Sequence, residues 1–344
     1  MKKVGTIFGI LAFVLLMTGA FPSAPAASSG KVWKLKGSCL FPPSGPRWDN
    51  LMQFVKKVKE RTNGQVDLEV IPSGGLAPAQ EEYDYLGKKL IDFSMGADAW
   101  IAAVKNEFGI FGVPGMDAKD VPAILKAGVL DALDRVAAKD NIKLVSAWQS
   151  LGFQGIAMRT KHLKKPADFK GALLFHTGPF LDKTHEILGA KPTPVSVAEL
   201  YTSLQTGVLH GVTTSVSAIK AFKMFEVCPY VTAFPGTSNL GLFAYLPAFN
   251  LDVWKSFPAD IQKTIIQAAD EVSQQSVANW MKGRKATEAF FKGMPDKVKF
   301  YQLSESEAQT LINKVKGPLK EFYLKRGGQG EKEIMAIVDK FYGR

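Results

Sequence analysis

Apolar and polar positions follow two different periods in the first hundred residues of the chain. Apolar or small residues occupy every second position from Val32 to Cys39 and again from Gln65 to Ile71, which predicts two strands. Between them, from Asp49 to Asn63, the apolar residues recur every three or four positions and predict an amphipathic helix. A second helix is expected from Pro78 to Lys89 and a third strand from Ile91 to Gly96. Strands that alternate with helices predict a largely parallel sheet that binds ligands at its carboxyl edge.

The next part of the chain predicts a change from helices to strands. Residues 98–140 favour helices with breaks, and strands are expected at 142–148 and 153–158. The second of these strands is where we expect the chain to cross into a second lobe. An aromatic and aliphatic stretch at 241–250 predicts a strand that returns to the first lobe.

The apolar pattern from Pro258 to about Lys292 continues without a strong helix breaker. A helix of roughly 35 residues would be about 50 Å long. A helix of that length can only lie across both lobes, so it predicts a shared element that holds them together. A further helix is expected after Ser304 and Glu307, which form a capping box, and a last one from 332 to 341.

A stretch from Asp168 to Tyr230 predicts strand, helix, strand, helix. The apolar run from Ala172 to Phe175 is short enough for a buried strand. Ser196 and Glu199 form a second capping box, and the helix that they open is expected to end near Gly207. Strand ends and a helix start therefore converge, as they do in the ligand crevices of α/β sheets.

Residues 1–27 show the pattern of a cleaved export signal. Lys2 and Lys3 are followed by the apolar segment Thr6 to Met17 and by the small residues Ala24 to Ala27. The apolar segment is too short to predict a membrane span. We therefore expect an exported, periplasmic protein without a permanent membrane anchor. Export also argues against nucleic acid as a partner, in spite of the formal net charge of +11. The basic charge indicates either a solvated surface or long-range attraction of an anionic solute.

The chain of 344 residues has two cysteines, Cys39 and Cys228. An oxidising compartment would allow them to form a disulfide. The alternative is a pair of free, buried thiols, and sequence spacing does not decide between the two.

No motif for catalysis or cofactor binding is present. The sequence lacks a Gly-x-Ser-x-Gly elbow, a phosphate-binding loop, a dinucleotide fingerprint and a His-Glu-x-x-His pair. The histidines at 162, 176, 185 and 210 lack the paired spacing of metal ligands. We therefore expect a binding protein rather than an enzyme, with no cofactor and no metal.

Three blocks of the chain resemble the signature region of the DctP-type periplasmic solute-binding proteins of tripartite ATP-independent periplasmic (TRAP) transporters. In this family the blocks read Asp-Leu-Lys-Gly, then Gly-Ala-x-Pro-Thr-Pro, then Glu-Val-Tyr-x-Ala-Leu-Gln-Thr-Gly-Val-Val-Asp-Gly. The corresponding residues here, in the same order, are Asp168–Gly171, Gly189–Pro194 and Glu199–Gly211. The Thr62-Asn-Gly64 turn also agrees with the family.

The resemblance implies a two-lobed α/β periplasmic solute-binding fold, type II-like, with a mixed sheet flanked by helices in each lobe. The first lobe would comprise residues 31–152 and about 238–275, and the second lobe 153–237 and about 276–344. The lobes would close over a small organic solute and present it to the membrane permease subunits of the transporter. The alternatives are the binding protein of an ATP-driven importer or a periplasmic enzyme with this fold.

The charged residues that clamp the solute in this family are neutral here. The family's carboxylate-binding Arg falls on Phe175, which either lines the pocket or points into the core. A second family Arg falls on Gln154, with Arg159 a few residues further on, and the Glu-Asn pair falls on Thr213 and Thr214. The complete set of candidate ligand-binding residues is Phe41, Trp48, Trp148, Phe153, Gln154, Arg159, Phe175, His176, Thr177, Thr213, Thr214 and Phe243. Neutral and aromatic residues at these positions predict an aromatic or hydrophobic monocarboxylate, or a neutral compound, rather than a C4-dicarboxylate.

Overall fold

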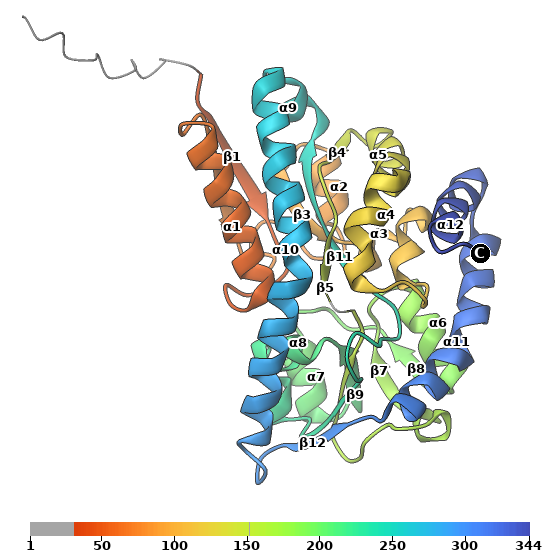
Figure 1. The fold of residues 1–344 in the computed structure, drawn as a ribbon. Coiled ribbons are helices and arrows are strands. Elements are labelled where there is room, and N and C mark those ends of the chain that lie inside the picture. Colours follow the sequence, from red (N-terminus) through yellow and green to blue (C-terminus); the bar gives the residue numbers. More distant parts are fainter. Residues whose placement is uncertain (1–30, 151) are drawn as a thin grey trace, which may run out of the picture. The chain divides into compact units, whose positions relative to one another are not determined.

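The strands of the protein form two separate sheets, each of six strands and each flanked by helices (Figure 1). The structure is a computed structural model that describes residues 31–150 and 152–344. Both sheets contain parallel and antiparallel pairs, so the predicted two-lobed α/β fold with a mixed sheet in each lobe is confirmed. The predicted export signal, residues 1–27, lies outside the described residues.

The first sheet contains the alternating strands predicted at the start of the chain. Its strands are β1 (Trp33–Ser38), β2 (Val66–Ile71), β3 (Phe93–Ala97), β4 (Ile142–Leu144), β5 (Trp148–Ser150) and β11 (Phe243–Asn250). The order is β2-β1-β3-β11-β4, and β5 also pairs with β11. β1 runs parallel to β2 and β3, whereas β11 runs antiparallel to its neighbours. The strand predicted at 142–148 is divided into β4 and β5, which pair with successive parts of β11.

The second sheet is assembled from shorter strands in the order β12-β10-β6-β9-β7-β8. These are β6 (Gly155–Met158), β7 (Leu173–Phe175), β8 (Lys191–Thr193), β9 (Gly211–Thr214), β10 (Tyr230–Ala233) and β12 (Lys299–Gln302). β7 runs parallel to β8 and β9, and β6 runs antiparallel to β9 and β10. The carboxyl ends of β7 and β9 and the amino end of β6 therefore lie at the same edge of the sheet.

The first helix, α1 (Pro46–Arg61), buries Leu51, Phe54 and Val58 against the first sheet. It begins three residues before the predicted start at Asp49, because Pro46 occupies its first turn. Proline favours this position because its fixed φ is helical and its missing N–H would have no partner there. This early start places Arg47 on the helix.

The remaining helical segments that lie between strands are mostly short, and those near the end of the chain are longer. They are α2 (Glu82–Gly87), α3 (Asp98–Ile101), η1 (Asn106–Gly112), η2 (Ala118–Asp120), α4 (Val121–Ile124), η3 (Leu125–Val129), α5 (Leu130–Ala138), η4 (Pro166–Phe169), α6 (Pro179–Leu188), α7 (Leu200–Thr206), α8 (Val216–Ala221), η5 (Met224–Glu226), α9 (Leu251–Lys255), α10 (Ala259–Lys292), α11 (Glu305–Arg326) and α12 (Gln329–Phe341). The predicted interruptions between 98 and 140 are therefore present, and α2 is shorter than the helix predicted at 78–89.

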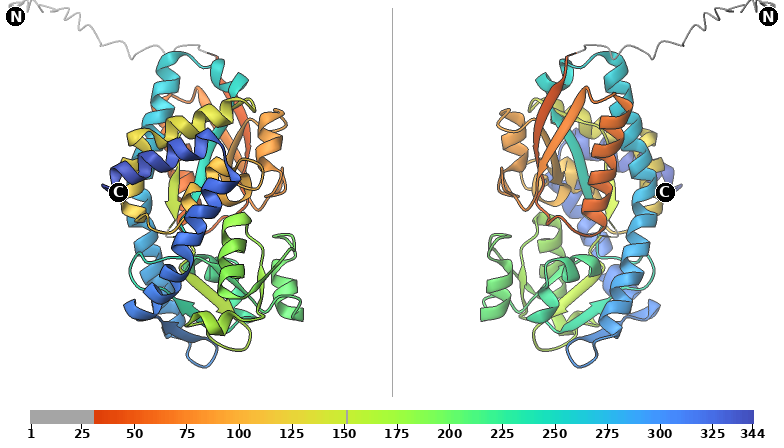
Figure 2. Two further views of the ribbon diagram at one scale, coloured as in Figure 1. Left: turned by 90° about the vertical axis from the view of Figure 1, so that its right-hand side faces the viewer. Right: turned by 90° about the vertical axis from the view of Figure 1, so that its left-hand side faces the viewer.

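The long helix α10 has 34 residues and extends along both sheets (Figures 1 and 2). It packs against α1 and β5 of the first sheet and against α8 and β12 of the second. Trp148 donates its indole N–H to the carbonyl of Ala269 on α10 over 3.0 Å, and Ser273 donates to the carbonyl of Ala147 over 3.1 Å. The prediction of a helix shared by both lobes is confirmed.

Together, the last two helices contact elements of both lobes. α11 packs against α6, and α12 packs against η1, η3 and α5. Asn106 of η1 donates to Glu331 of α12 over 3.0 Å. The assignment of residues 31–152 with 238–275 to one lobe, and of 153–237 with 276–344 to the other, stays a prediction.

Cys39 and Cys228 are both fully buried, and both are free thiols. Cys39 directly follows β1 of the first sheet, whereas Cys228 lies two residues before the start of β10 of the second, so the fold holds them apart. The alternative of a disulfide between them is therefore wrong for this structure. Burial raises the pKa of each thiol to about 12, so neither is a reactive thiolate at neutral pH.

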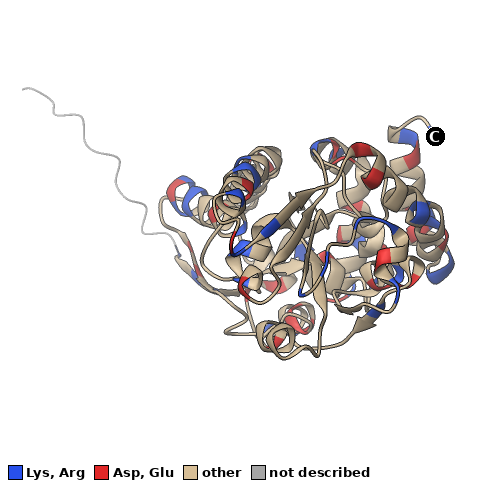
Figure 3. Cartoon of the chain, turned by 90° about the horizontal axis from the view of Figure 1, so that it is seen from below, with Lys and Arg blue, Asp and Glu red and all other residues tan. Residues whose placement is uncertain are grey.

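Charged side chains of both signs are carried largely by the helices, as Figure 3 shows in a view from below. None of the helices in the described part of the chain combines the length and the apolar character that a membrane crossing requires. Within residues 31–150 and 152–344, no group of three His, Cys, Asp or Glu side chains is arranged to hold a metal ion.

Candidate functional site

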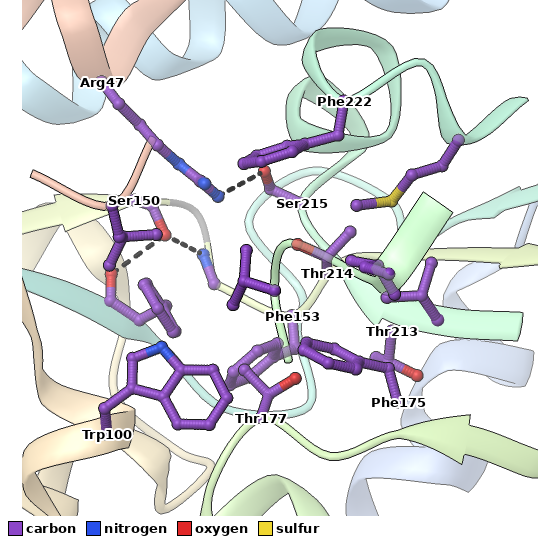
Figure 4. A pocket seen from close by; sticks show the side chains of 17 residues that line it. Arg47, Trp100, Ser150, Phe153, Phe175, Thr177, Thr213, Thr214, Ser215 and Phe222 are labelled. Carbon is purple, nitrogen blue, oxygen red and sulfur yellow. Dashed lines mark hydrogen bonds between the residues drawn. The ribbon is translucent and has the colours of Figure 1, made fainter. Parts of the chain in front are cut away.

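A cavity lies where the carboxyl ends of the parallel strands of both sheets meet (Figure 4). Its volume is about 60 Å³, several times the roughly 10–15 Å³ that one water molecule requires. Six of the predicted site residues line it: Phe153, Phe175, Thr177, Thr213, Thr214 and Phe243. The fold brings them together because β7 and β9 end at this edge, while the antiparallel strands β6 and β11 begin there.

Aromatic rings from both lobes form much of the cavity wall. Phe175 is the last residue of β7, and its ring lies edge-on to Trp100 of α3 with 6.3 Å between the centroids. Phe153 and Phe243 are also edge-on, 5.4 Å apart. Of the two predicted positions for Phe175, pocket wall or core, the structure therefore shows the pocket wall. Rings of this kind suit a flat or apolar solute group.

The hydroxyl of Thr213 is held by a buried histidine. Nε2 of His185 lies 3.0 Å from Oγ1 of Thr213, and both side chains are fully buried. Desolvation by burial lowers the pKa of His185 to about 3, so the ring is neutral at physiological pH. The Thr213 hydroxyl is thus fixed by the protein, whereas the buried hydroxyl of Thr177 has no hydrogen-bond partner among the described residues.

Arg47 is the one ionisable residue among the described residues that line the cavity. Its guanidinium comes from the first turn of α1 and donates to Oγ of Ser215, the residue before α8, over 3.3 Å. Ser215 also accepts the N–H of Ala218 over 3.1 Å and so caps α8. Arg47 therefore connects the helix of the first lobe with the cavity wall of the second.

Three further predicted site residues do not line the cavity. Gln154 is fully buried beside it, and both polar atoms of its side chain lack partners among the described residues. His176 turns away to hydrogen-bond Asp182, which raises the pKa of the histidine, and its ring packs 5.6 Å from that of Trp100. Arg159 lies at the other end of β6, about 13 Å along the strand at 3.3 Å per residue, and donates to the carbonyl of Gln205.

Three predicted aromatic residues pack elsewhere, which corrects their expected place in the cavity wall. Trp148 is buried under α10, where it lies edge-on to Phe54. Phe41 packs against Tyr245 with 5.4 Å between centroids and lines a smaller neighbouring cavity. Trp48 follows Arg47 on α1, and one helical step of about 100° turns it away from the cavity.

The prediction missed several lining residues, of which Arg47 and Trp100 matter most. The others are Leu40, Ser150, Gly152, Val197, Leu200, Val212, Ser215, Phe222 and Met224. Arg47 and Trp100 both follow the carboxyl end of a parallel strand of the first sheet, which is where α/β sheets bind ligands. The rule points to the segments after β1 and β3, but it does not single out Arg47 and Trp100, which lie in the helices α1 and α3 that follow those segments.

Two mixed sheets that share a long helix and enclose a cavity between them are the architecture of a two-lobed solute-binding protein. The model of the DctP family, described as bacterial extracellular solute-binding protein family 7, matches residues 38–326. The chain therefore belongs to the DctP family.

One relative and two solved structures are similar to this chain. The C4-dicarboxylate-binding periplasmic protein DctP of Rhodobacter capsulatus is 28% identical over 281 residues, which are 78% of each chain. A TRAP periplasmic solute-binding protein of Desulfovibrio salexigens, solved with bound orotic acid, has a TM-score of 0.81 at 24% identity and covers 91% of this chain and 99% of its own. A similar protein of Sulfurospirillum deleyianum, solved with succinate, has a TM-score of 0.77 at 22% identity and covers 90% and 100%. The similarity to the two structures supports the fold.

Proposed function

We propose that this protein is the periplasmic solute-binding subunit of a TRAP-type uptake system and holds a small organic solute between its two sheets. The observation that carries the proposal is the cavity at the converging strand ends, with walls from both lobes. Membership of a family of extracellular solute-binding proteins supports it. The partners would be the solute and the membrane permease subunits. We expect the protein to be exported and residues 1–27 to be removed, and N-terminal sequencing of the exported protein checks that removal.

We further propose that the solute is an aromatic or hydrophobic monocarboxylate, or a neutral compound, rather than a C4-dicarboxylate. Phe175, Phe153, Phe243 and Trp100 surround the cavity with rings. A dicarboxylate would bring two full charges out of water, and each is costly to bury without its own charged or strongly hydrogen-bonding partner. The cavity has one cationic side chain to offer among its described lining residues.

Titration calorimetry with two sets of solutes tests this proposal. We expect micromolar binding of some ring or branched monocarboxylates, with orotate and benzoate among the probes, and no micromolar binding of succinate, malate or fumarate. Phe175→Ala should weaken the bound solute by more than about tenfold, because the substitution removes both apolar burial and ring stacking. Phe341→Ala, at an exposed ring on α12, is the matched control and should leave the affinity unchanged.

Micromolar succinate binding that survives Phe175→Ala would show that the solute class is wrong. Mass spectrometry of the compound that copurifies with the native protein would identify the solute directly. Conversion of any of these solutes by the purified protein would favour an enzyme with this fold.

A further inference from the structure

The residues around Arg47 satisfy its hydrogen-bonding groups and its charge only in part. Its guanidinium carbon lies 5.1 Å from the ring centroid of Tyr245, 5.4 Å from that of Trp280 and 5.9 Å from that of Phe243. Rings at these distances attract the cation through their electron-rich faces. Its Nε is shut off from solvent and has no hydrogen-bond partner among the described residues.

Arg284 shows how the same protein satisfies a buried arginine that has a structural role. Its Nε pairs with Oε1 of Glu288 at 2.6 Å, and its other nitrogens donate to the carbonyls of Phe234 and Gly236. Arg47 has one neutral hydroxyl as a partner, and no described carboxylate lies within 4 Å of it. Arg47 is half-buried, and a cation that is partly removed from water without an anion is costly, so this site favours an anionic occupant.

The charge of Arg47 persists in this environment. Burial lowers the pKa of its guanidinium, which makes the cation less stable than in water, but an arginine remains protonated in proteins. An anion at the unpaired side of the guanidinium would restore part of the stability that the cation loses on burial. A carboxylate suits it best, because the planar guanidinium can donate two parallel hydrogen bonds to the two carboxylate oxygens.

The cavity has a second unsatisfied polar group in a different place. In Figure 4 Thr177 lies beside Phe153 and Phe175, on the side of the cavity away from Arg47. Its buried hydroxyl has no partner among the described residues, and a hydroxyl can both donate and accept a hydrogen bond. Between these two polar points the walls are mainly apolar or aromatic.

We propose that Arg47 is the residue that recognises the solute's charge, and that the solute carries a single carboxylate at Arg47 and a neutral hydrogen-bonding group directed toward Thr177. The inference rests on the proposed function and narrows its solute class to monoanions. The guanidinium binds the carboxylate, the rings hold the body of the solute, and Thr177 selects a hydroxyl, carbonyl or amide at the far end. Arg47 thus takes over the charge recognition that the neutral residues Phe175 and Gln154 do not provide.

The experiment compares each monocarboxylate with its own uncharged amide in the wild-type protein. The probes are benzoate, 4-hydroxybenzoate and phenylacetate beside benzamide, 4-hydroxybenzamide and phenylacetamide, measured by titration calorimetry. An acid and its amide have nearly the same shape, so their affinity ratio reports the charge. We expect at least one acid to bind about tenfold or more tightly than its amide, since hydrogen bonds to charged groups are stronger than neutral ones.

Substitutions then assign that ratio to Arg47. Arg47→Met should reduce the ratio of acid to amide affinity to within about threefold, and Arg47→Lys should keep part of it because the charge remains. Arg284→Lys is the matched control, and it should lower the melting temperature without changing the ratio. Thr177→Val should weaken 4-hydroxybenzoate more than benzoate, because only the former can use the hydroxyl partner.

The outcomes separate this inference from the proposed function. Equal affinity for acids and amides in the wild-type protein would overturn the role of Arg47 and leave a binding protein for neutral solutes. A ratio that persists in Arg47→Met would place the charge recognition on another residue. Tight binding of dicarboxylates, with none of the acids or amides bound, would overturn this inference and the proposed solute class but not the proposed role as a solute-binding subunit.

Discussion

At the scale of single residues, the cavity wall depends on groups that stand behind it. Thr213 lines the cavity, and its hydroxyl is held by His185 of α6. Nδ1 of His185 is buried and has no partner among the described residues, and the nearby His176 further disfavours its protonation. A protonated His185 would place an uncompensated charge behind the wall, so this arrangement requires a neutral ring.

Fold stability should therefore decrease in mild acid because of His185. The unfolded chain binds a proton below a histidine pKa of about 6.5, whereas the folded chain does so only near a pKa of about 3. Stability rises with pH wherever the unfolded state binds more protons, so this contribution is complete above pH 6.5 and is lost as the pH falls toward 3. At pH 5 the loss amounts to about 2 kcal/mol.

Urea unfolding at pH 8 and pH 5 measures this effect. His185→Gln keeps a donor for Thr213 and cannot titrate, so its stability should fall by about 2 kcal/mol less than that of the wild type between the two pH values. His210→Gln, at an exposed histidine, serves as the control for the exchange of a histidine. Equal losses in wild type and His185→Gln would mean that the folded protein accepts the proton at His185.

At the scale of elements, α10 fixes the start of α1 and with it Arg47. Gly283 of α10 faces Pro46, the first residue of α1 and the neighbour of Arg47. A Cβ added at Gly283 would lie 2.4 Å from Cγ of Pro46, closer than two carbon atoms can approach. The glycine therefore allows the close contact of the two helices at the point where Arg47 enters the cavity.

Gly283→Ala should destabilise the protein although alanine is the better helix former. The exchange gains about 1 kcal/mol of helix propensity, but the overlap with Pro46 costs roughly 1–3 kcal/mol. We expect a net loss of up to about 2 kcal/mol in the free energy of unfolding and weaker solute binding, because Arg47 must shift with Pro46. Chemical denaturation and calorimetry measure the two effects.

A second substitution identifies the cause of that loss. Pro46→Ala removes Cγ and Cδ, so the double variant Gly283→Ala/Pro46→Ala should be more stable than the sum of the two single changes predicts. Additive effects would show that the contact between Gly283 and Pro46 is not responsible.

The sequence predicted elements with a strong, local pattern well. The strands and the helix at 32–71 and the long helix α10 have regular apolar periods, and the structure contains them with small shifts at their ends. The direction of β11 and the division of the strand at 142–148 depend on pairing between distant segments, which local periodicity does not encode.

The site was predictable only where it coincides with the family blocks and the strand ends. Phe175, Thr213 and Thr214 belong to such strands and line the cavity. Trp148 and Phe41 are equally aromatic and equally near strand ends, but their orientation was decided by packing against α10 and Tyr245. Arg47 escaped prediction because a lone arginine on an amphipathic helix usually points into solvent, and only the tertiary contacts with Trp280 and Ser215 show that its guanidinium packs into the protein.

At the scale of the whole molecule, the two lobes are joined by chain segments that also pair with each other. The N–H of Phe153 donates to the carbonyl of Gly241 over 2.9 Å, and the N–H of Leu240 donates back to Phe153 over 3.0 Å. Gly152 has a φ of +73°, and a Cβ there would lie 2.2 Å from the Gly241 carbonyl oxygen, so the close pairing requires glycine. With α10 as a third connection, these segments can act as a hinge, since hinge motions concentrate in a few connecting residues.

A recess beside the cavity lies between residues of both lobes. Its volume is about 500 Å³, and it is lined by Pro42 and Ser73 from one side and by Ser196 and Phe222 from the other. Phe222 also lines the cavity itself. A change in the angle between the lobes would therefore change the width of this recess.

Solute binding should both close the lobes and stabilise the fold. A solute held by both lobes binds the folded protein only, so a hundredfold excess over its dissociation constant should add about 2.7 kcal/mol of stability. A decrease in the radius of gyration, measured by small-angle X-ray scattering, should accompany the rise in melting temperature. The reason is that one solute molecule contacts both Arg47 of α1 and the cavity walls formed by β7 and β9, which brings the two lobes closer together. Arg47→Met in the presence of a monocarboxylate at the same concentration should show a smaller change in both quantities. A rise in melting temperature at constant radius would mean that the solute occupies a preformed cavity and that binding does not move the lobes.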